Sequence, residues 1–440
     1  MKKIQSHLSA PWLLALASMS WVACSGGDDT SPTPEVSPSP EITPTPTPTP
    51  EPAPIVPEGC DVAVYPSADD QTEVQEALIT SAENDVVCLV DGPFKFLGEL
   101  SIDKKGLTLR GINQPELDFS DQVAGGNGIH VISDDFIIEG LTVRNPAGDG
   151  IRATAVENVL FSNVKVLWDT SSTDNGGYGL YPVSSTGVII EDSEVSGASD
   201  AGVYVGQSTQ IIVRDNEVYG NVAGIEIENS TDAEVTRNHC YDNTGGILVF
   251  NLPELPVKDG KRAKVHNNLI EENNRENFAP EGNIVGLVPP GTGIMVFASD
   301  NNEINDNTIR GNVSVGVVYA FYNPDLVSDY EDVSFDAYPE GNFTHNNLFE
   351  NNGTSPKGII RAIMLDKGLS APIPPMLWDG CVDPAKEVSP ALVNCFSNNV
   401  DQDGAAAGFV DVRLCTTTGE VPSFDVTGVT CEHDTLDTLE

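Results

Sequence analysis

Short apolar-x-apolar triplets recur along the middle of the chain at regular distances. The first clear copy begins at Phe136 and ends at Ile138, and after mostly polar residues another apolar residue follows at Val143. The third residue of each triplet is an anchor, and the anchors are Ile138, Phe161, Ile190, Val213, Val235, Val265, Ile304 and Thr344. The shortest steps between anchors are 22 and 23 residues, and the longer steps, of 29 to 40 residues, contain insertions. Self-similarity at about 22 residues indicates a solenoid in which each repeat is one coil.

A second motif, Gly-apolar-x-apolar, alternates with the first. It begins at Gly128, Gly150, Gly179, Gly202, Gly224, Gly246, Gly293 and Gly316. Both motifs have a period of two, which is typical of short strands with one buried face. Leucine-rich repeats share the coil length, but the core positions here are Val and Ile, which favour strands, and no helical pattern separates the motifs. We therefore predict that strands of successive coils stack in parallel, about 4.8 Å apart.

Asparagine recurs at two fixed offsets from the anchors. Three residues after the anchors stand Asn216, Asn238, Asn268, Asn307 and Asn347, and eight residues after them stand Asn221, Asn243, Asn273, Asn312 and Asn352. Asparagine tolerates the left-handed backbone conformation, and it can hydrogen-bond to its copy in the next coil. Two asparagine ladders at two corners of the coil are therefore expected.

The ends of a solenoid expose unpaired strand edges, which need caps. Residues 69–82 are amphipathic, with Val74, Ala77 and Leu78 on one face, and predict a helix over the N-terminal end. The predicted β-helix with this cap spans residues 60–365. Residues 366–440 lose the repeat and are expected to form a C-terminal cap.

The first residues of the chain have the layout of a signal peptide. Lys2 and Lys3 precede an apolar stretch at residues 11–19, and small residues follow it. That stretch is too short to span a bilayer. Residues 1–23 are therefore predicted to direct export and to be removed.

The residues around the first cysteine indicate a lipid anchor. Residues 20–23, before Cys24, resemble a bacterial lipobox, so Cys24 is expected to carry lipid, with ordinary signal cleavage as the alternative. In a Gram-negative bacterium, Ser25 would direct such a lipoprotein to the outer membrane, facing the periplasm or the cell surface. Residues 24–59 are rich in Ser, Thr, Pro and Glu and predict an extended stalk without a core.

The formal charge is strongly negative. It is −44, and removal of residues 1–23, with two lysines and no acid, changes it to −46. This potential repels nucleic acid and anionic lipid, so no nucleic-acid partner is expected and the lipid anchor is the expected membrane contact. The carboxylates could serve solubility alone or bind Ca²⁺. No residue pattern identifies a particular metal site or another cofactor.

The chain has eight cysteines. Cys24 is assigned to lipid, and Cys240 falls at a core position of its coil, where the other copies carry Val, Ile or Phe. The remaining six lie in the predicted caps, and six cysteines allow about 15 connectivities. Their order in the chain suggests the local bridges Cys60–Cys88, Cys381–Cys395 and Cys415–Cys431.

The x residue of each Gly-apolar-x-apolar strand is expected to point outward. In five consecutive coils this column reads His130, Arg152, Tyr181, Tyr204 and Glu226. Arginine can bind a carboxylate, and tyrosine or histidine can transfer a proton, so the column is a candidate contact surface for a uronate-containing polysaccharide. The alternative is a mixed polar sheet face that is stabilised by cross-strand pairs.

Several insertions could form walls beside this column. The loop at residues 167–178 carries Trp168 and Asp174, which we expect to border the ligand groove. Longer insertions occupy residues 251–262, 274–292 and 320–341. The aromatic side chains of the last could stack on sugars or pack the insertion onto the solenoid.

The coils from Asn127-Gly128-Ile129 onward resemble the right-handed, pectin-lyase-like β-helix superfamily. Together with residues 277–293 and Met376-Leu377-Trp378-Asp379-Gly380, they make the chain similar to a family of exported bacterial parallel β-helix repeat proteins of unknown function. The resemblance covers about residues 60–400. It implies an extracytoplasmic location and a partner such as an exported c-type cytochrome-like protein. The catalytic residues of the superfamily's lyases have no counterparts here, so the resemblance transfers the fold and no catalytic residue.

These observations favour a lipid-anchored, extracytoplasmic β-helix that binds polysaccharide or another extended ligand on its lateral face. One alternative is a polysaccharide-active enzyme of the uronate lyase or C5-epimerase type. Another is a non-catalytic scaffold for an exported partner protein. The sequence leaves open whether the protein is an enzyme.

Overall fold

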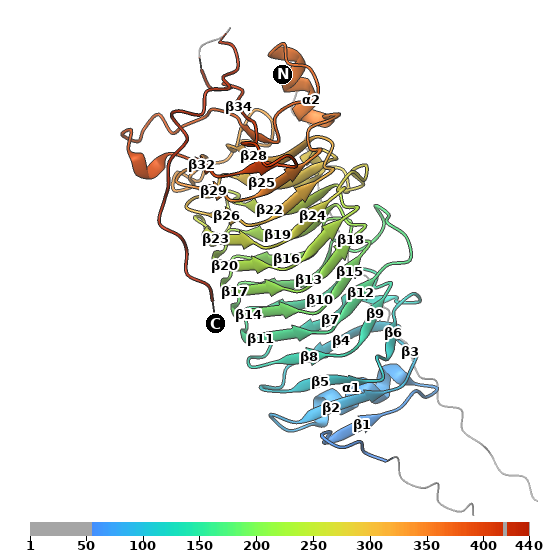
Figure 1. The fold of residues 1–440 in the computed structure, drawn as a ribbon. Helices are drawn as coiled ribbons and strands as arrows, with labels where there is room; N and C mark the ends of the chain where they lie inside the picture. Colours follow the sequence, from blue (N-terminus) through green and yellow to red (C-terminus); the bar gives the residue numbers. More distant parts are fainter. Residues whose placement is uncertain (1–54, 417–419, 440) are drawn as a thin grey trace, which may run out of the picture. The chain divides into compact units, whose positions relative to one another are not determined.

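The computed structural model describes residues 55–416 and 420–439. Over these residues the chain winds into a parallel β-solenoid, and successive coils contribute strands to three long sheets (Figure 1). Sheet A has 12 strands, and sheets B and C have 11 each. The predicted signal peptide, Cys24 and most of the predicted stalk lie outside the described residues. No helix in the described ranges is long and apolar enough to cross a membrane.

The strands of the three sheets are two to eight residues long. Sheet A contains β1 (Val62–Val64), β2 (Val86–Val90), β5 (Thr108–Ile112), β8 (Ile137–Glu139), β11 (Glu157–Ser162), β14 (Thr186–Glu191), β17 (Thr209–Arg214), β20 (Thr231–Thr236), β23 (Lys261–His266), β26 (Glu303–Asn305), β29 (Phe343–His345) and β32 (Cys395–Ser397). Sheet B contains β3 (Phe94–Lys95), β6 (Glu116–Asp118), β9 (Thr142–Arg144), β12 (Lys165–Leu167), β15 (Glu194–Ser196), β18 (Glu217–Tyr219), β21 (His239–Tyr241), β24 (Leu269–Glu271), β27 (Thr308–Arg310), β30 (Leu348–Glu350) and β33 (Val400–Asp401). Sheet C contains β4 (Gly98–Ile102), β7 (Ala124–Val131), β10 (Asp149–Thr154), β13 (Tyr178–Val183), β16 (Ala201–Gly206), β19 (Ala223–Glu228), β22 (Gly245–Phe250), β25 (Thr292–Phe297), β28 (Val315–Ala320), β31 (Met376–Trp378) and β34 (Phe409–Asp411).

The apolar triplets form sheet A, with their first and third residues in the core. Ile190 of β14 pairs with Phe161 of β11 and Val213 of β17, and all three side chains are fully buried. The predicted parallel register is therefore confirmed. The coil of about 22 residues holds where no insertion occurs, and with the insertions the average is about 26 residues per turn.

The glycine at the start of the sheet C motif is required by close packing between coils. A Cβ atom at Gly150 would lie 2.4 Å from the backbone oxygen of Gly179 and 2.5 Å from Cγ1 of Val166. No Cβ can occupy that space without moving the next coil. The repeated glycine thus reflects the tight corner between sheets B and C.

Both predicted asparagine ladders are present. Asn243 Nδ2 donates to the backbone oxygen of Val218 and to Oδ1 of Asn273, at 2.9 and 3.0 Å. Its own Oδ1 accepts from the backbone nitrogen and Nδ2 of Asn221, at 3.0 and 3.1 Å. Asn243 is fully buried, so the ladder satisfies backbone groups at a corner that water does not reach.

The predicted N-terminal helix is α1 (Asp70–Thr80). The Asp69 side chain caps it by accepting a hydrogen bond from the backbone nitrogen of Thr72. Val74, Ala77 and Leu78 are buried, which confirms the predicted apolar face. Cys240 is also buried and has no disulfide partner among the described cysteines, which agrees with its predicted core position.

The C-terminal region contains more solenoid than predicted. After α2 (Gly358–Asp366), strands β31, β32 and β33 extend sheets C, A and B, and β34 adds a further strand to sheet C. The sheets therefore continue past residue 365, the predicted end of the β-helix. Two short 3-10 helices, Ile284–Leu287 and Pro390–Leu392, lie within connecting segments.

Two of the three predicted disulfides are wrong. Cys60–Cys88 is present, but the C-terminal bridges are Cys381–Cys415 and Cys395–Cys431 rather than Cys381–Cys395 and Cys415–Cys431. Because β31 and β34 stack on each other, the segments that follow them bring Cys381 and Cys415 together. Stacking of coils, and not order in the chain, decides these pairings.

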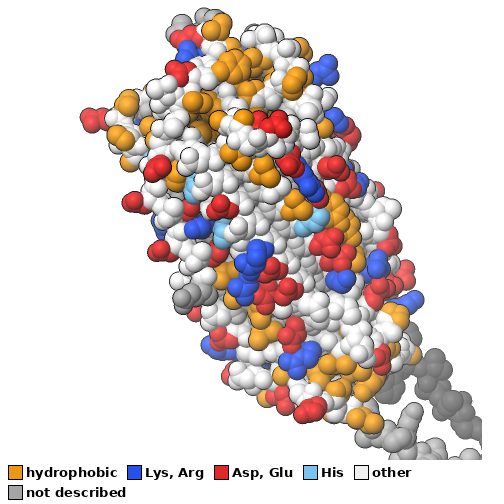
Figure 2. Space-filling model, in the orientation of Figure 1, with side chains coloured by type: hydrophobic (Ala, Val, Ile, Leu, Met, Phe, Trp, Pro, Cys, Tyr) orange, Lys and Arg blue, Asp and Glu red, His pale blue; other side chains and the backbone are white. Residues whose placement is uncertain are grey.

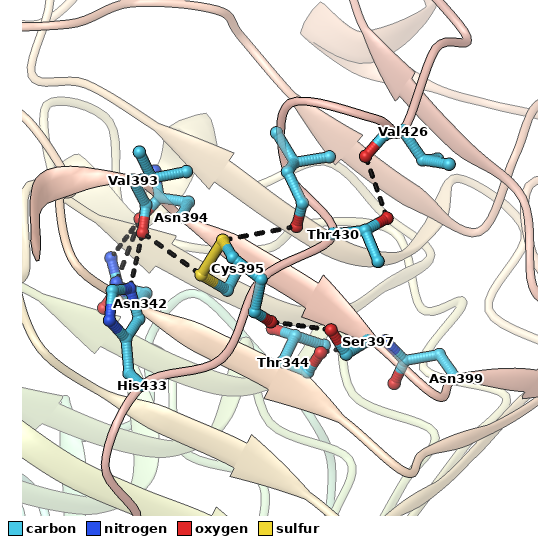
Figure 3. The surroundings of a disulfide bond; sticks show 12 residues. Asn342, Thr344, Val393, Asn394, Cys395, Ser397, Asn399, Val426, Thr430 and His433 are labelled. Carbon is cyan, nitrogen blue, oxygen red and sulfur yellow. Dashed lines mark hydrogen bonds between the residues drawn. A yellow bond between two sulfur atoms is a disulfide. The ribbon is translucent and has the colours of Figure 1, made fainter. Parts of the chain in front are cut away.

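The second C-terminal disulfide holds the final segment against the last coil. Figure 3 shows Cys395 at this bridge, near Ser397, whose hydroxyl donates to the backbone oxygen of Cys431 at 2.6 Å. His433 Nε2 donates to the backbone oxygen of Val393 at 2.7 Å. The chain then runs along sheet A as a C-terminal tail (Figure 1), where the backbone nitrogen of Leu436 donates to Glu303.

Outward side chains are commonly paired between neighbouring coils. Arg214 binds Glu191 at 2.6 Å, and Arg237 binds Asp215 at 2.6 Å. Figure 2 shows Lys and Arg side chains beside Asp and Glu side chains along the visible flank of the solenoid, with hydrophobic side chains gathered towards both of its ends. These pairs join neighbouring coils and balance part of the negative charge locally.

Candidate functional site

The outward column of sheet C forms as predicted, and its residues lie in consecutive coils. His130 pairs with Arg152, and Arg152 pairs with Tyr181. Tyr204 pairs with Glu226 further along the sheet. The five side chains do not share one environment, however, because insertions cover only part of this face.

The first half of the column is partly open to solvent. His130 Nε2 lies 3.3 Å from Oγ1 of Thr154, and the Nε of Arg152 donates to the same hydroxyl at 3.2 Å. The Arg152 guanidinium lies over the Tyr181 ring, 4.8 Å from its centroid. This half presents a cation and an aromatic face, and Glu99 lies 3.8 Å from Nδ1 of His130.

The second half of the column is buried. Tyr204 and Glu226 are 4% and 3% exposed. The Tyr204 hydroxyl donates to Oε1 of Glu228 at 2.6 Å, and the ring folds over Gly206, where a Cβ atom would lie 2.4 Å from the hydroxyl oxygen. The sequence placed Tyr204 and Glu226 on an open face, and this expectation is wrong. Farther along, the outward side chains of Leu248, Met295 and Val318 are buried in an apolar cluster.

Three buried carboxyl groups lie together at this point. Asp200 immediately precedes β16, and Glu226 and Glu228 both point outward from β19. The Tyr178 hydroxyl and the Asn283 side chain each donate to Oδ2 of Asp200 at 3.4 Å. Oε2 of Glu226 has no hydrogen-bond partner among the described residues. We call Asp200, Glu226 and Glu228 the carboxyl cluster.

Burial changes the proton affinity of the carboxyl cluster. It raises the pKa of Asp200 to about 7, and repulsion by Glu228 adds to this effect. Burial also raises the pKa of Glu228 to about 7, although the hydrogen bond from Tyr204 acts in the opposite direction. The pKa of Glu226 rises well above its ordinary range through burial and the charges of its two neighbours. Asp200 and Glu228 can therefore exchange protons near neutral pH.

The carboxyl cluster lines a cleft of about 450 Å³ between sheet C and the inserted segments. Asn283 to Val285 contribute from one insertion, Leu252 to Leu255 from another, and Ser328 to Tyr330 from a third. Aromatic side chains in its lining are Tyr178, Phe250, Tyr322 and Tyr330. The predicted role of the insertions as walls is therefore matched by their position, and we call this cavity the acidic cleft.

Trp168 and Asp174 do not border the acidic cleft. Trp168 is buried, and its Nε1 donates to the backbone oxygen of Pro146 at 2.9 Å. Asp174 is exposed, and it shares a separate shallow pocket with Trp168 and Asn145. The prediction that these two residues wall the groove is wrong, because the loop turns Trp168 into the core. Tyr178, at the end of the same loop, does reach the cleft.

Sequence reasoning missed Asp200 and Glu228. The spacing of Glu226 and Glu228 carried a usable signal, because alternate residues of a strand share one face. Asp200 lies outside the strand motif and carried no such signal. Within residues 55–416 and 420–439, no group of three or more His, Cys, Asp or Glu side chains is arranged to hold a metal ion, so the structure assigns no site there for Ca²⁺, which the sequence left as one of two alternatives.

The comparisons with known proteins agree with this architecture. The model of the right-handed β-helix region family matches residues 127–274 and 168–330. The chain is a right-handed β-helix repeat protein. No curated protein matches the β-helix protein.

Solved structures similar to the β-helix protein include three that act on polysaccharides by their names. The A-module of the Azotobacter vinelandii mannuronan C-5 epimerase AlgE4 has 14% identity and a TM-score of 0.46, with 78% of this chain and 92% of that chain covered. A double mutant of the periplasmic alginate epimerase AlgG has 14% identity and a TM-score of 0.45, with coverages of 78% and 83%. Pectate lyase Pel9A has 14% identity and a TM-score of 0.44, with 83% of each chain covered. At this level of similarity no conclusion about activity follows.

Proposed function

We propose that the β-helix protein binds a polysaccharide along the outward face of sheet C, with the acidic cleft as its central subsite. The observation that carries this proposal is the composition of the cleft. Aromatic side chains line its sides, and the carboxyl cluster lies in its lining. Ligand sites commonly combine such apolar surfaces with a few converging polar groups.

The two kinds of side chain supply the two requirements of sugar recognition. The ring faces of Tyr178 and Tyr330 offer flat apolar surface for the C–H face of a sugar, and a tyrosine keeps a polar tip for its edge. Carboxyl oxygens accept hydrogen bonds from hydroxyl groups, and charge-assisted bonds of this kind are the stronger ones. The open half of the column, with Arg152 above Tyr181, continues the binding surface along the solenoid.

A second candidate function is cleavage of a glycosidic bond within the cleft. It is favoured by the pKa values near 7 of Asp200 and Glu228, because a general acid works best when its pKa lies near the working pH. The uronate lyase or epimerase alternative is less favoured in the cleft, since the carboxyl cluster repels a uronate. Such chemistry would be confined to the open half of the face, at Arg152.

We also propose that the protein acts outside the cytoplasm. The signal-peptide layout and the lipobox-like residues before Cys24 support lipid anchoring, at the outer membrane in a Gram-negative cell. The scaffold function for an exported partner protein, such as a c-type cytochrome, remains a third proposal. It rests on the family resemblance alone.

A glycan array followed by isothermal titration calorimetry tests polysaccharide binding. We expect the protein to retain at least one glycan, and Glu226→Gln and Tyr178→Ala to weaken that binding. Glu217→Gln is the matched control, because Glu217 is an exposed sheet B residue that also accepts a tyrosine hydrogen bond. Release of reducing ends would support the hydrolytic candidate. Absence of binding to every glycan, with the protein folded, would refute the proposal.

A further inference from the structure

We propose that the acidic cleft recognises a free amino group, so that its glycan contains amino sugars that carry a positive charge. This inference rests on the proposed polysaccharide binding and names the class of sugar. Three observations of the described residues carry it: an unpartnered buried carboxyl oxygen, the absence of cationic side chains from the lining, and a contrast with carboxylates elsewhere on the solenoid that have cationic partners.

The first observation concerns Glu226. Its side chain is 3% exposed and lines the cleft, and its Oε2 accepts no hydrogen bond within the described residues. A buried polar atom without a partner costs free energy, and a buried charge without one costs more. A ligand that donates to this oxygen removes the cost.

The second observation is the charge of the lining. Five acidic residues line the cleft, and no Lys, Arg or His is among its described lining residues. These acids are Asp200, Glu226, Glu228, Glu254 and Asp329. The hydrogen bonds that the carboxyl cluster receives come from the neutral donors Tyr178, Tyr204 and Asn283. Nothing in the lining neutralises these acids once they ionise.

The third observation is that several outward carboxylates elsewhere on this solenoid have cationic partners. Glu191 is bound by Arg214 at 2.6 Å, and Glu194 is bound by Lys165 at 2.7 Å. Each of these pairs joins neighbouring coils on a solvated face. The carboxyl cluster is more deeply buried and lacks such a partner, so the missing cation is the feature that a ligand can supply.

An ammonium group fits these requirements better than a hydroxyl group. It carries three donors and a full positive charge, and the cluster offers three carboxyl groups from two neighbouring coils. A hydroxyl can donate only once and leaves the charge unbalanced. The aromatic lining then holds the sugar ring that carries the amine.

Binding of an ammonium group should drive protons off the cleft. The titratable groups that face the cleft are Tyr178 of β13, Asp200 before β16, Tyr204 of β16, Glu226 and Glu228 of β19, Glu254 in the first long insertion, and Tyr322, Asp329 and Tyr330 in the third. Burial raises the pKa of Asp200 and Glu228 to about 7, so both hold part of their protons below neutral pH. A cation stabilises their ionised forms and releases those protons, whereas a neutral sugar releases none.

The test compares two oligosaccharides of equal length against the full chain. One is a β-1,4-linked glucosamine hexamer, and the other is the glucose hexamer, which has a hydroxyl in place of each amine. Calorimetry in buffers of different ionisation enthalpy at about pH 5, where the sugar amines already carry their protons, measures both affinity and the protons released by the cleft. We expect the glucosamine hexamer to bind more than about tenfold tighter, with net proton release.

Variants locate the effect in the cleft. Glu226→Gln and Glu228→Gln should each abolish most of the preference for the amine, and Glu217→Gln should leave it unchanged. Urea unfolding of each variant shows whether it is folded, and Glu228→Gln retains an acceptor for Tyr204.

Each contrary outcome is distinct. Equal binding of the two hexamers without proton release would overturn the amino-sugar inference and leave polysaccharide binding intact. Binding of neutral glycans from the array, but not of the glucosamine hexamer, would also overturn the amino-sugar inference and leave polysaccharide binding intact. Binding of a simple polyamine as tightly as the glucosamine hexamer would overturn the sugar class. Failure of every glycan to bind would refute the proposed function itself.

Discussion

Replacement of Glu228 by glutamine should stabilise the protein at alkaline pH. The residue is buried, and burial raises its pKa from 4.5 to about 7. In the unfolded chain the carboxyl ionises near 4.5, while in the folded protein it keeps its proton up to about 7. Between these values the folded state binds more protons, so stability falls as the pH rises through this window and stays low above it.

The size of the effect follows from these two values. Each factor of ten in proton affinity corresponds to about 1.4 kcal/mol, and the difference between 4.5 and about 7 therefore amounts to about 3 kcal/mol. Glutamine has no charge to bury, and its Oε1 can still accept the hydrogen bond from Tyr204. We expect the variant to match the wild type near pH 4 and to gain about 3 kcal/mol in free energy of unfolding near pH 8.

Urea unfolding at fixed ionic strength measures this difference at several pH values. Glu217→Gln provides the control, because that glutamate accepts a similar hydrogen bond from Tyr241, at 2.7 Å, on an exposed face. The control should show no gain that grows with pH. A gain in Glu228→Gln that is the same at acid and alkaline pH, or a loss at pH 8, would refute the reasoning. Stabilisation together with weaker ligand binding would indicate that the carboxyl cluster is retained for function at a cost in stability.

Three further predictions follow from the packing. Asn243→Ala should lower the free energy of unfolding by about 3 kcal/mol or more, because it leaves buried ladder groups unpaired, and Asn243→Ser should lose less; urea unfolding measures both. Gly206→Ala should displace the Tyr204 ring and weaken glycan binding in calorimetry, while Gly126→Ala, where a Cβ meets nothing within 4 Å, should not. Cys395→Ser should cost about 2–4 kcal/mol at the C-terminal end by opening a bridge with a sequence separation of 36. Limited proteolysis should then cleave the C-terminal tail faster, and unchanged cleavage would contradict a tethering role.

The repeated coil was accessible from the sequence because its determinants are local. Ile190 and its copies recur at fixed distances, and a period of two decides which side chains face the core. The same period carried the information that Glu228 shares a face with Glu226, although this pair was not recognised as a site. The ladder asparagines, such as Asn243, followed from a constant offset, since each coil repeats the same corner. The helix over residues 70–80 followed from its own apolar face.

Only the tertiary structure decided which part of that face is a site. Tyr204 and Glu226 are buried because insertions 251–262, 274–292 and 320–341 fold over sheet C, and no local pattern states where an insertion folds. The same covering removes water from Asp200 and raises its pKa. Trp168, expected at the groove, lies in the core because its own loop turns it inward, which no local pattern indicated.

The pairing of the C-terminal cysteines was also decided by the tertiary structure and not by the sequence. Cys381 and Cys415 are separated by 34 residues, and they meet because two coils stack at the end of the solenoid. By itself the sequence determined the coil, its register and its buried positions, because the same short pattern is repeated in every coil. The acidic cleft and the C-terminal bridges depend on contacts between segments that follow no repeated pattern. These contacts exclude water from the side chains between them, and they exist only once the chain has folded.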